Sequence, residues 1–180
     1  MKATGIVRRI DDLGRVVIPK EIRRTMRIRE GDPLEIYTDN EGGVIFKKYS
    51  PIGELSTFAG QYSEVLYKAA GVPVVVCDRD HVIAVAGIPK KELIERRASV
   101  QLEEIMEQRK SFAFSTQDGK KLQPVEGSDR LALVASPILA AGDVAGAVIL
   151  IASDTSASAG ETEIKLISVA ASFLGKQMEE

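Results

Sequence analysis

The chain has 180 residues, of which 44% are hydrophobic and 28% charged, and its formal net charge is −2, so it has the composition of one large or two small folded domains. Its start lacks the apolar run of a secretory signal, and no stretch approaches the roughly 20 apolar residues that span a bilayer, so we expect a cytoplasmic protein without a membrane partner. The single cysteine, Cys77, cannot form an internal disulfide or, by itself, a structural zinc site.

Positive charge is concentrated at the start of the chain. Residues 1–29 hold nine lysines and arginines against three carboxylates, a net charge of +6, which leaves −8 on the other 151 residues. The electric field that attracts phosphate groups is local, so this asymmetry indicates a nucleic-acid partner for the first segment. The acidic remainder indicates no second phosphate-binding surface.

The first segment begins with a predicted hairpin. Two β-branched runs, residues 5–10 and 15–18, flank a turn sequence that contains Gly14. Pro19 suits the first position of a helix, so residues 20–26 are predicted to form about two helical turns. Two apolar side chains of this helix are expected to face inward, Ile22 and Met26.

A second hairpin is predicted from strands at residues 34–38 and 44–48, which are joined by the turn sequence DNEGG. Two hairpins of this size cannot bury a core alone, because surface dominates volume in domains of fewer than about 40 to 50 residues. Two copies of the segment could bury one by interleaving their hairpins. The sequence therefore predicts at least a dimer.

The arginines of this segment are candidates for DNA contact. They alternate with β-branched residues and include two adjacent pairs, and the planar guanidinium fork suits phosphates and guanine edges. The alternative is a solvated charged face without a partner, which is the commoner meaning of a scattered charge run. We favour DNA contact because of the alternation and the pairs.

Four segments carry a resemblance to a known family: GIVRRIDDLGRVVIP at 5–19, EIRRT at 21–25, LEIY at 34–37 and KKY at 47–49. They are similar to the AbrB family of bacterial transition-state regulators. The resemblance implies a dimeric swapped-hairpin barrel of strands and short helices, which presents arginines to double-stranded DNA. On the matching positions this role falls to Arg8, Arg15, Arg23 and Arg24, with Arg9 and Lys20 as helpers.

The sequence SPIG at residues 50–53 breaks the pattern, so we expect one domain at 1–53 and a second at 54–180. In the second domain, apolar periodicity and turn residues predict an α+β layout with an antiparallel sheet. Its predicted elements are helices at 54–70, within 90–109 and at 161–178, and strands at 72–78, 81–86, 112–115, 131–139 and 144–152.

This order of elements, with the hairpin sequence ALVASPILAAGDVAGAVILI at 132–151, resembles a GAF domain, a small-molecule sensor module. The resemblance implies a pocket framed by residues 90–109, 112–115 and 116–130. Its ligand is unknown, and the signature of cyclic-nucleotide-binding GAF domains is not visible. We expect no cofactor. A GAF domain that only mediates dimerisation fits the sequence as well as a GAF domain that senses a small molecule.

The two resemblances also raise two other functions, methionine sulfoxide reduction and toxin neutralisation. One GAF subgroup reduces free methionine sulfoxide, but that chemistry uses several cysteines, whereas Cys77 lies in an apolar strand and His81 in a turn, so we expect neither catalytic nor metal-binding residues. The second alternative is an antitoxin, because swapped-hairpin barrels also repress toxin operons. The core periodicity after residue 54 leaves no disordered tail to hold a toxin.

In this order, the two domains resemble a family of sporulation regulators of the Bacillus group. The resemblance implies an activator and repressor of sporulation genes in the forespore, associated with the nucleoid. GAF domains commonly pair through their terminal helices, here residues 54–70 and 161–178. If that pairing joins different barrels, the protein is a homotetramer.

Overall fold

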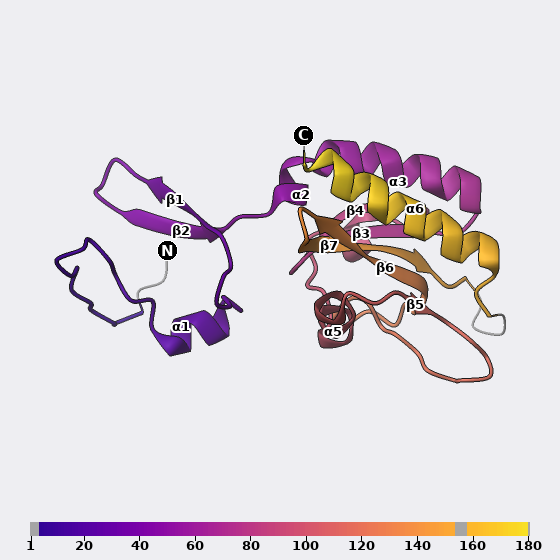
Figure 1. Ribbon diagram of the computed structural model, residues 1–180, viewed down its shortest axis with the longest axis horizontal. Coiled ribbons are helices and arrows are strands. Elements are labelled where there is room, and N and C mark those ends of the chain that lie inside the picture. The colour runs from indigo at the N-terminus through magenta and orange to yellow at the C-terminus, as the bar shows by residue number, and fades with distance from the viewer. Residues whose placement is uncertain (1–3, 154–157, 180) are drawn as a thin grey trace. The chain divides into compact units, whose positions relative to one another are not determined.

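The computed structural model describes residues 4–153 and 158–179. It divides the chain into two compact units, Met1–Tyr49 and Ser50–Glu180 (Figure 1). Lys2, one of the nine basic residues counted above, lies outside the described residues. In the described part of the chain, no helix combines the length and apolar character needed to cross a membrane.

The first unit contains one short helix and one hairpin. Helix α1 spans Lys20–Thr25, and strands β1, Leu34–Thr38, and β2, Val44–Lys48, pair antiparallel at the predicted positions. The carboxylate of Asp39 holds the turn between them by accepting hydrogen bonds from the backbone nitrogens of Glu41 (3.0 Å) and Gly43 (2.7 Å). The second predicted hairpin is therefore confirmed.

The first predicted hairpin is wrong for the single chain. The turn is present, because Asp11 N donates to Arg15 O (3.0 Å), but the runs at 5–10 and 15–18 do not continue it as a ladder. Both runs lack a strand beside them to complete their backbone hydrogen bonds. Met26, which was expected to face inward, is 58% exposed for the same reason, since nothing in the unit covers it.

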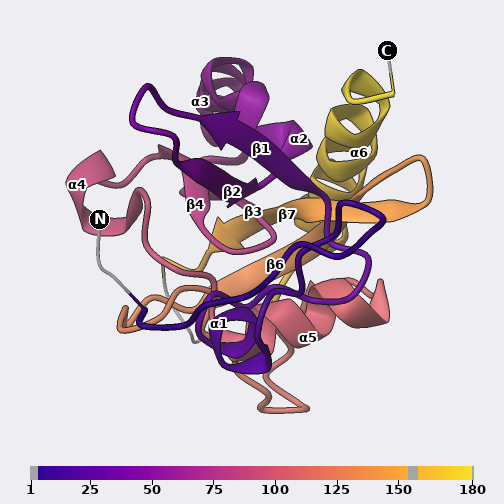
Figure 2. The same cartoon turned by 90° about the vertical axis from the view of Figure 1, so that its left-hand side faces the viewer.

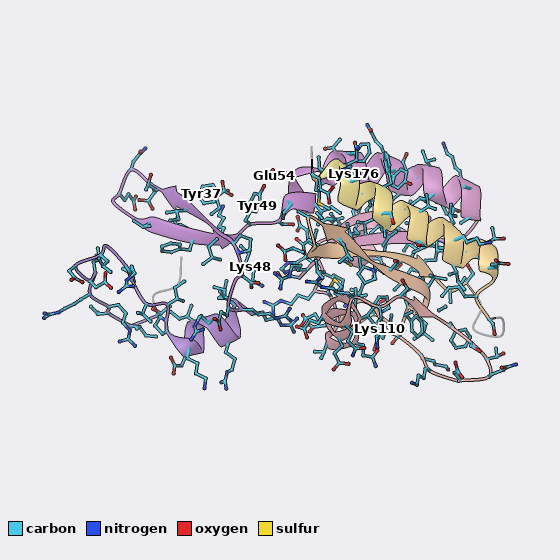
Figure 3. The ribbon with its side chains drawn as sticks, viewed as in Figure 1. Tyr37, Lys48, Tyr49, Glu54, Lys110 and Lys176 are labelled. Carbon is cyan, nitrogen blue, oxygen red and sulfur yellow. The ribbon has the colours of Figure 1, made fainter. Side chains whose placement is uncertain are left out.

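The first unit has apolar side chains but no apolar core. Among its described residues, 4–49, Pro19 is the only apolar residue that is buried, and Val7 is 85% exposed. In the hairpin, Ile36 lies opposite Phe46, and both are exposed on one face. Tyr37 and Lys48 project to opposite sides of the hairpin (Figure 3). The unit thus presents a hydrophobic surface that its own residues do not cover.

The second unit is a five-stranded antiparallel sheet with helices on both faces (Figures 1 and 2). The order of its strands across the sheet is β4-β3-β7-β6-β5. The helices are α2 Pro51–Glu54, α3 Ser56–Ala70, α4 Lys90–Leu93, α5 Val100–Gln108 and α6 Glu161–Gln177, and the strands are β3 Val74–Asp78, β4 Val82–Ala86, β5 Phe112–Ala113, β6 Ala132–Ala140 and β7 Asp143–Ile151. This arrangement confirms the predicted α+β layout.

Three helix boundaries in the second unit have a local cause. Gly71 ends α3 in the left-handed conformation, with φ +66°. Ser99 caps α5 by accepting a hydrogen bond from Leu102 N (3.1 Å), which explains the predicted interruption in the helical segment. The junction sequence at residues 50–53 forms the start of α2, and its Ile52 is fully buried in the core of the second unit.

Successive residues of the strands point alternately into two separate apolar cores, one on each face of the sheet. Val74 and Val76 face α3 and α6, whereas Val75 and Cys77 face the side of the sheet covered by α4 and α5. Since both faces of this sheet are covered, its strands read as almost continuous apolar runs. Helix α6 approaches β6 closely at Gly175, where an added Cβ would lie 2.0 Å from the carbonyl oxygen of Leu139.

The outer surfaces of α3 and α6 carry exposed apolar side chains. Val65 and Val169 are 59% and 63% exposed, and an aromatic cluster of Phe58, Tyr62 and Phe173 has ring centroids 5.2 to 6.2 Å apart. Val65, and Ile164 on α6, fit helical apolar periodicity but are exposed in the single chain. We define this surface, Phe58, Tyr62, Val65, Val169 and Phe173, as the outer helix face.

Candidate nucleic-acid interface

The first turn of the chain is built by Asp11. Its carboxylate accepts hydrogen bonds from the backbone nitrogens of Leu13 (3.0 Å) and Arg15 (2.8 Å), and it also accepts one from Arg15 Nε (2.8 Å). Gly14 takes the left-handed conformation that the turn requires, with φ +75°. One acidic side chain therefore fixes both the backbone and the side chain of Arg15.

This network lowers the pKa of Asp11. The largest cause is the hydrogen bond from the Arg15 backbone, followed by the one from the Arg15 side chain. The carboxylate consequently stays ionised and keeps Arg15 in place at neutral pH. The sequence analysis missed this role of Asp11. The available signal was an aspartate at the start of a turn, because its carboxylate can accept a hydrogen bond from the backbone nitrogen two residues later and form an Asx turn.

Helix α1 carries the adjacent pair Arg23 and Arg24. Both side chains are exposed, as is Lys20 at the first position of the helix. Pro19 precedes the helix and its carbonyl accepts the hydrogen bond from Arg23 N (3.0 Å), so the helix starts at Lys20, as predicted, and ends at Thr25, one residue earlier than predicted. The pair therefore projects from a rigid turn rather than from a loose loop.

Exposure separates two groups of basic residues in the first unit. Arg27 and Arg29 are partly buried, and the backbone nitrogen of Arg29 donates to the Asp32 carboxylate (2.8 Å), which also pairs with Lys48 Nζ (3.7 Å). The six predicted DNA-contacting residues are all exposed: Arg8, Arg9, Arg15, Lys20, Arg23 and Arg24. Arg8, Arg9 and Arg15 flank the Asp11 turn, and the other three belong to α1. Their role in DNA contact stays a prediction.

The cavity found in the second unit does not lie where the sensor pocket was expected. The face of the sheet under α5 and residues 116–130 is filled by buried side chains, among them Leu102 and Val125. A cavity of about 430 Å³ instead lies at the rim of this layer, and residues 112–115 do not line it. Its lining residues are Glu92, Arg96, Gly127, Ser128, Asp129, Arg130, Leu131 and Ala152. Sequence reasoning did not single out Arg96 or Arg130.

The residues considered for redox or metal chemistry do not form a site. Cys77 is fully buried, and burial raises the pKa of its thiol, so the reactive thiolate is suppressed. His81 is exposed, and its backbone nitrogen donates to the Asp78 carboxylate (2.6 Å). Within the described ranges, no cluster of three or more histidine, cysteine or acidic side chains has the geometry to hold a metal ion.

Comparisons with known proteins agree with this division into units. Residues 54–179 match the family described as stage V sporulation protein T C-terminal, transcription factor, and residues 7–54 match the family of the bacterial antitoxin MazE. Stage V sporulation protein T of Bacillus subtilis is 54% identical, with 100% of both chains covered. The transition state regulatory protein AbrB of B. subtilis is 51% identical over 42% of this chain and 77% of its own length.

A solved structure supports the fold of the second unit. The GAF domain of a phosphoenolpyruvate-protein phosphotransferase from Coxiella burnetii superimposes with a TM-score of 0.54 at 15% identity, over 69% of this chain and 82% of that one. A GAF-type unit that follows an AbrB-like basic unit defines a transcription regulator rather than an enzyme. The chain belongs to the family of stage V sporulation protein T.

Proposed function

We propose that the protein regulates sporulation genes by binding duplex DNA through the six exposed basic residues of its first unit. Arg8, Arg15, Arg23 and Arg24 make the principal contacts, and Arg9 and Lys20 assist them. The observation that supports this proposal is the exposure of all six on two adjoining elements of a unit similar to AbrB. The setting is the forespore nucleoid, where the protein activates some genes and represses others.

The contacts are expected to be largely electrostatic. Each arginine or lysine that neutralises a phosphate releases condensed counterions, so about six contacts make the affinity fall steeply with salt concentration. Arginine at this density also supplies bidentate contacts to guanine edges, which add sequence preference. The Asp11 turn pre-orients Arg15 and so reduces the entropy that ordering this side chain costs on binding.

The functional particle contains at least two first units. The uncovered apolar side chains of residues 4–49 support an intertwined barrel, in which each chain completes the strand pairing of the runs at 5–10 and 15–18 in the other. A dimer also doubles the number of basic residues on one DNA face. Pairing of the outer helix faces of two second units would join two barrels into a homotetramer, which raises the effective concentration at paired sites.

Retardation of a duplex by the full chain tests the proposal. The double variant R23A/R24A is expected to lose at least about 100-fold in affinity and to flatten the salt dependence by about two counterions. The matched control is K90A/K91A, which removes an adjacent pair of exposed cations from α4 in the second unit. Equal retardation by the two folded double variants would contradict the assignment.

The second unit is proposed to modulate DNA binding in response to a small molecule. The supporting observation is the cavity at residues 92–96 and 127–131 in a unit with the fold of GAF sensor modules. A ligand acts on DNA affinity only if it binds the DNA-competent and incompetent forms differently. Retardation measured with and without a cavity ligand tests this part separately.

An antitoxin is the second candidate, because residues 7–54 match the family of the antitoxin MazE. In the antitoxin mechanism weighed above, a disordered tail holds the toxin. Residues after 50 form two apolar cores around a sheet, which favours the regulator over this mechanism. Co-purification of a small toxin with the full chain would favour the antitoxin instead.

A further inference from the structure

The rim cavity of the second unit contains two guanidinium groups in different electrostatic states. Arg130 is neutralised by a two-point contact with the Glu92 carboxylate, with Nε to Oε1 at 2.7 Å and Nη2 to Oε2 at 3.1 Å. Arg96 is instead held by two backbone carbonyls, that of Glu92 (3.2 Å) and that of Gly127 (2.9 Å). Within the described part of the chain, no carboxylate lies within ion-pair distance of Arg96.

Arg96 is therefore oriented by carbonyl groups and not by a direct ion pair, although the charge of Glu92 also acts on it. A guanidinium has five N–H donors, and the two carbonyls engage two of them. Gly127 makes this placement possible, because it lacks the Cβ that would lie 2.9 Å from Arg96 Nη2, and its φ of +65° is left-handed. The loop thus holds the guanidinium in place. Because the side chain is already ordered, little further conformational entropy is lost when it binds an anion.

The geometry of the neighbouring pair indicates which anion fits. The bidentate contact between Arg130 and Glu92 shows that the wall of this cavity already accommodates one planar carboxylate on a guanidinium. Ser128 is 5% exposed, and its hydroxyl lies close enough to accept from Arg130 N (3.3 Å), so its own hydrogen is available to an acceptor. Leu131 and Ala152 add an apolar part to the lining.

Charge limits the ligand to a single negative charge. The cavity is lined by two guanidinium groups and two carboxylates, those of Glu92 and the exposed Asp129, so their charges cancel. A monoanion can pair with Arg96, whereas the second charge of a dianion would face Asp129 without compensation. The volume of about 430 Å³ is within the range of about 300–1,000 Å³ that is usual for small-molecule sites.

We infer that this cavity binds a small monocarboxylate with an apolar tail, with its carboxylate on Arg96 and its tail against Leu131 and Ala152. This inference rests on the proposed sensory role of the second unit and names the chemical class of its ligand. Bound there, the ligand would contact both Arg96, which follows α4, and the loop at 127–131, two segments that the hydrogen bond from Glu126 N to Arg97 O (2.9 Å) already joins.

Saturation-transfer NMR on the full chain, with sodium butyrate as the probe at constant ionic strength, tests the inference. Butyrate is expected to bind more tightly than acetate because of its longer apolar tail. Arg96→Lys keeps the charge but loses the fork, so its affinity for butyrate should fall by about tenfold. The control Arg97→Lys alters the adjacent, exposed arginine outside the cavity and should leave the affinity unchanged.

A glycine pair gives a second test that leaves both arginines in place. Gly127→Ala inserts a Cβ against Arg96 Nη2 and should weaken butyrate binding, whereas Gly119→Ala carries the same left-handed strain, with φ +63°, in open space. Equal affinity in the two alanine variants, or in the two lysine variants, would overturn the inference. Phosphate that competes as well as acetate would overturn it too, since it would indicate general anion attraction.

The outcome is distinguishable from failure of the proposed function. Retardation of DNA by the full chain without butyrate tests the DNA-binding role and does not depend on the cavity ligand. Butyrate that binds through Arg96 without changing retardation would support the site and count against the sensory role. Absence of butyrate binding, with intact retardation, would refute the site and leave the DNA-binding role unaffected.

Discussion

The two units of this chain solve the problem of burying apolar side chains in opposite ways. The second unit covers both faces of its sheet with its own helices, and Val74, Val75, Val76 and Cys77 are all fully buried. The first unit also contains apolar runs, yet among residues 4–49 Pro19 is the only apolar residue that is buried. The difference supports the proposal that another copy completes the first unit, whereas the second unit covers both faces of its sheet with its own helices.

Exposed apolar residues and arginines alternate in the strand-like runs of the first unit. Pairing with a second copy that buries Ile6, Val7 and Ile10 would therefore also fix the positions of the neighbouring arginines. Each buried aliphatic side chain contributes about 1.5–3 kcal/mol. Assembly and DNA recognition are therefore expected to fail together in the first unit, and to be independent of the fold of the second.

The largest effect is expected from a charge on the exposed apolar face of the hairpin. Phe46→Asp places a carboxylate where the second copy is expected to pack, and burying an unpaired charge costs about 3–5 kcal/mol. The full chain should no longer pair its barrels, and its DNA affinity, measured by retardation, should fall by more than about 100-fold. Asn40→Asp adds the same charge at the exposed turn and should change neither. Equal losses in both variants would contradict the assignment of this face.

A charge on the outer helix face should affect assembly without abolishing DNA binding by each dimer. Val169→Asp is expected to halve the mass of the particle in light scattering, because an unpaired carboxylate would oppose pairing of α3 and α6. The control Ser168→Asp adds the same charge at an exposed position of α6 that lies about 100° around the helix from Val169. An unchanged mass for Val169→Asp would exclude this face as the second interface.

Close helix packing in the second unit gives a moderate effect. Gly175→Ala adds a Cβ that would lie 2.0 Å from the Leu139 carbonyl oxygen, so the free energy of unfolding should fall by about 1–3 kcal/mol in urea titrations. Gly60→Ala lies within α3 with no atom in contact range and should stabilise the protein by up to about 1 kcal/mol. A neutral Gly175→Ala would contradict the described approach of α6 to β6.

Local pre-organisation of Arg15 should contribute less. Asp11→Asn keeps an acceptor for the turn but removes the charged contact with Arg15 Nε, so DNA affinity is expected to fall about three- to tenfold. Asp12→Asn removes a carboxylate of the same turn for which no hydrogen bond with Arg15 is seen. If Asp12→Asn weakens retardation as much as Asp11→Asn, net charge rather than the Asp11 turn governs the effect.

The smallest effect is a pH dependence of the second unit. The hydrogen bonds from Arg130 hold the pKa of Glu92 below its ordinary value of 4.5. The pair therefore contributes its full stability above about pH 4.5 and loses it as the pH falls through the lowered pKa. Urea titrations at decreasing pH should show a smaller loss for Glu92→Gln than for the unaltered chain. The control Glu95→Gln, outside the cavity, should lose as much as the unaltered chain.

The sequence predicted what local pattern determines. The hairpin at 34–48 and the order of elements in the second unit follow from apolar periodicity and turn residues, and all of them are confirmed. Burial was harder to predict, because Val65 and Ile164 fit helical periodicity yet face outward in one chain. Periodicity identifies an apolar stripe but not whether the same chain covers it.

Features that depend on distant residues or on a second chain escaped prediction. The hairpin at 5–18 needs strands that one chain does not supply, so its propensity alone was insufficient. Glu92 and Arg130 are 38 residues apart, and no local pattern joins them. The candidate DNA-contacting residues could be named from the sequence because they are clustered in it, and their role stays a prediction, whereas the cavity around Arg96 arises only from the tertiary fold.

The most direct test of the central claim is the mass of the fragment 1–53 in sedimentation equilibrium. The account predicts a dimer at micromolar concentration, with strand content higher than that of one described chain, because two copies complete the runs at 5–10 and 15–18. A folded, monomeric fragment that retards DNA would contradict it, since the apolar surface would then serve neither assembly nor recognition.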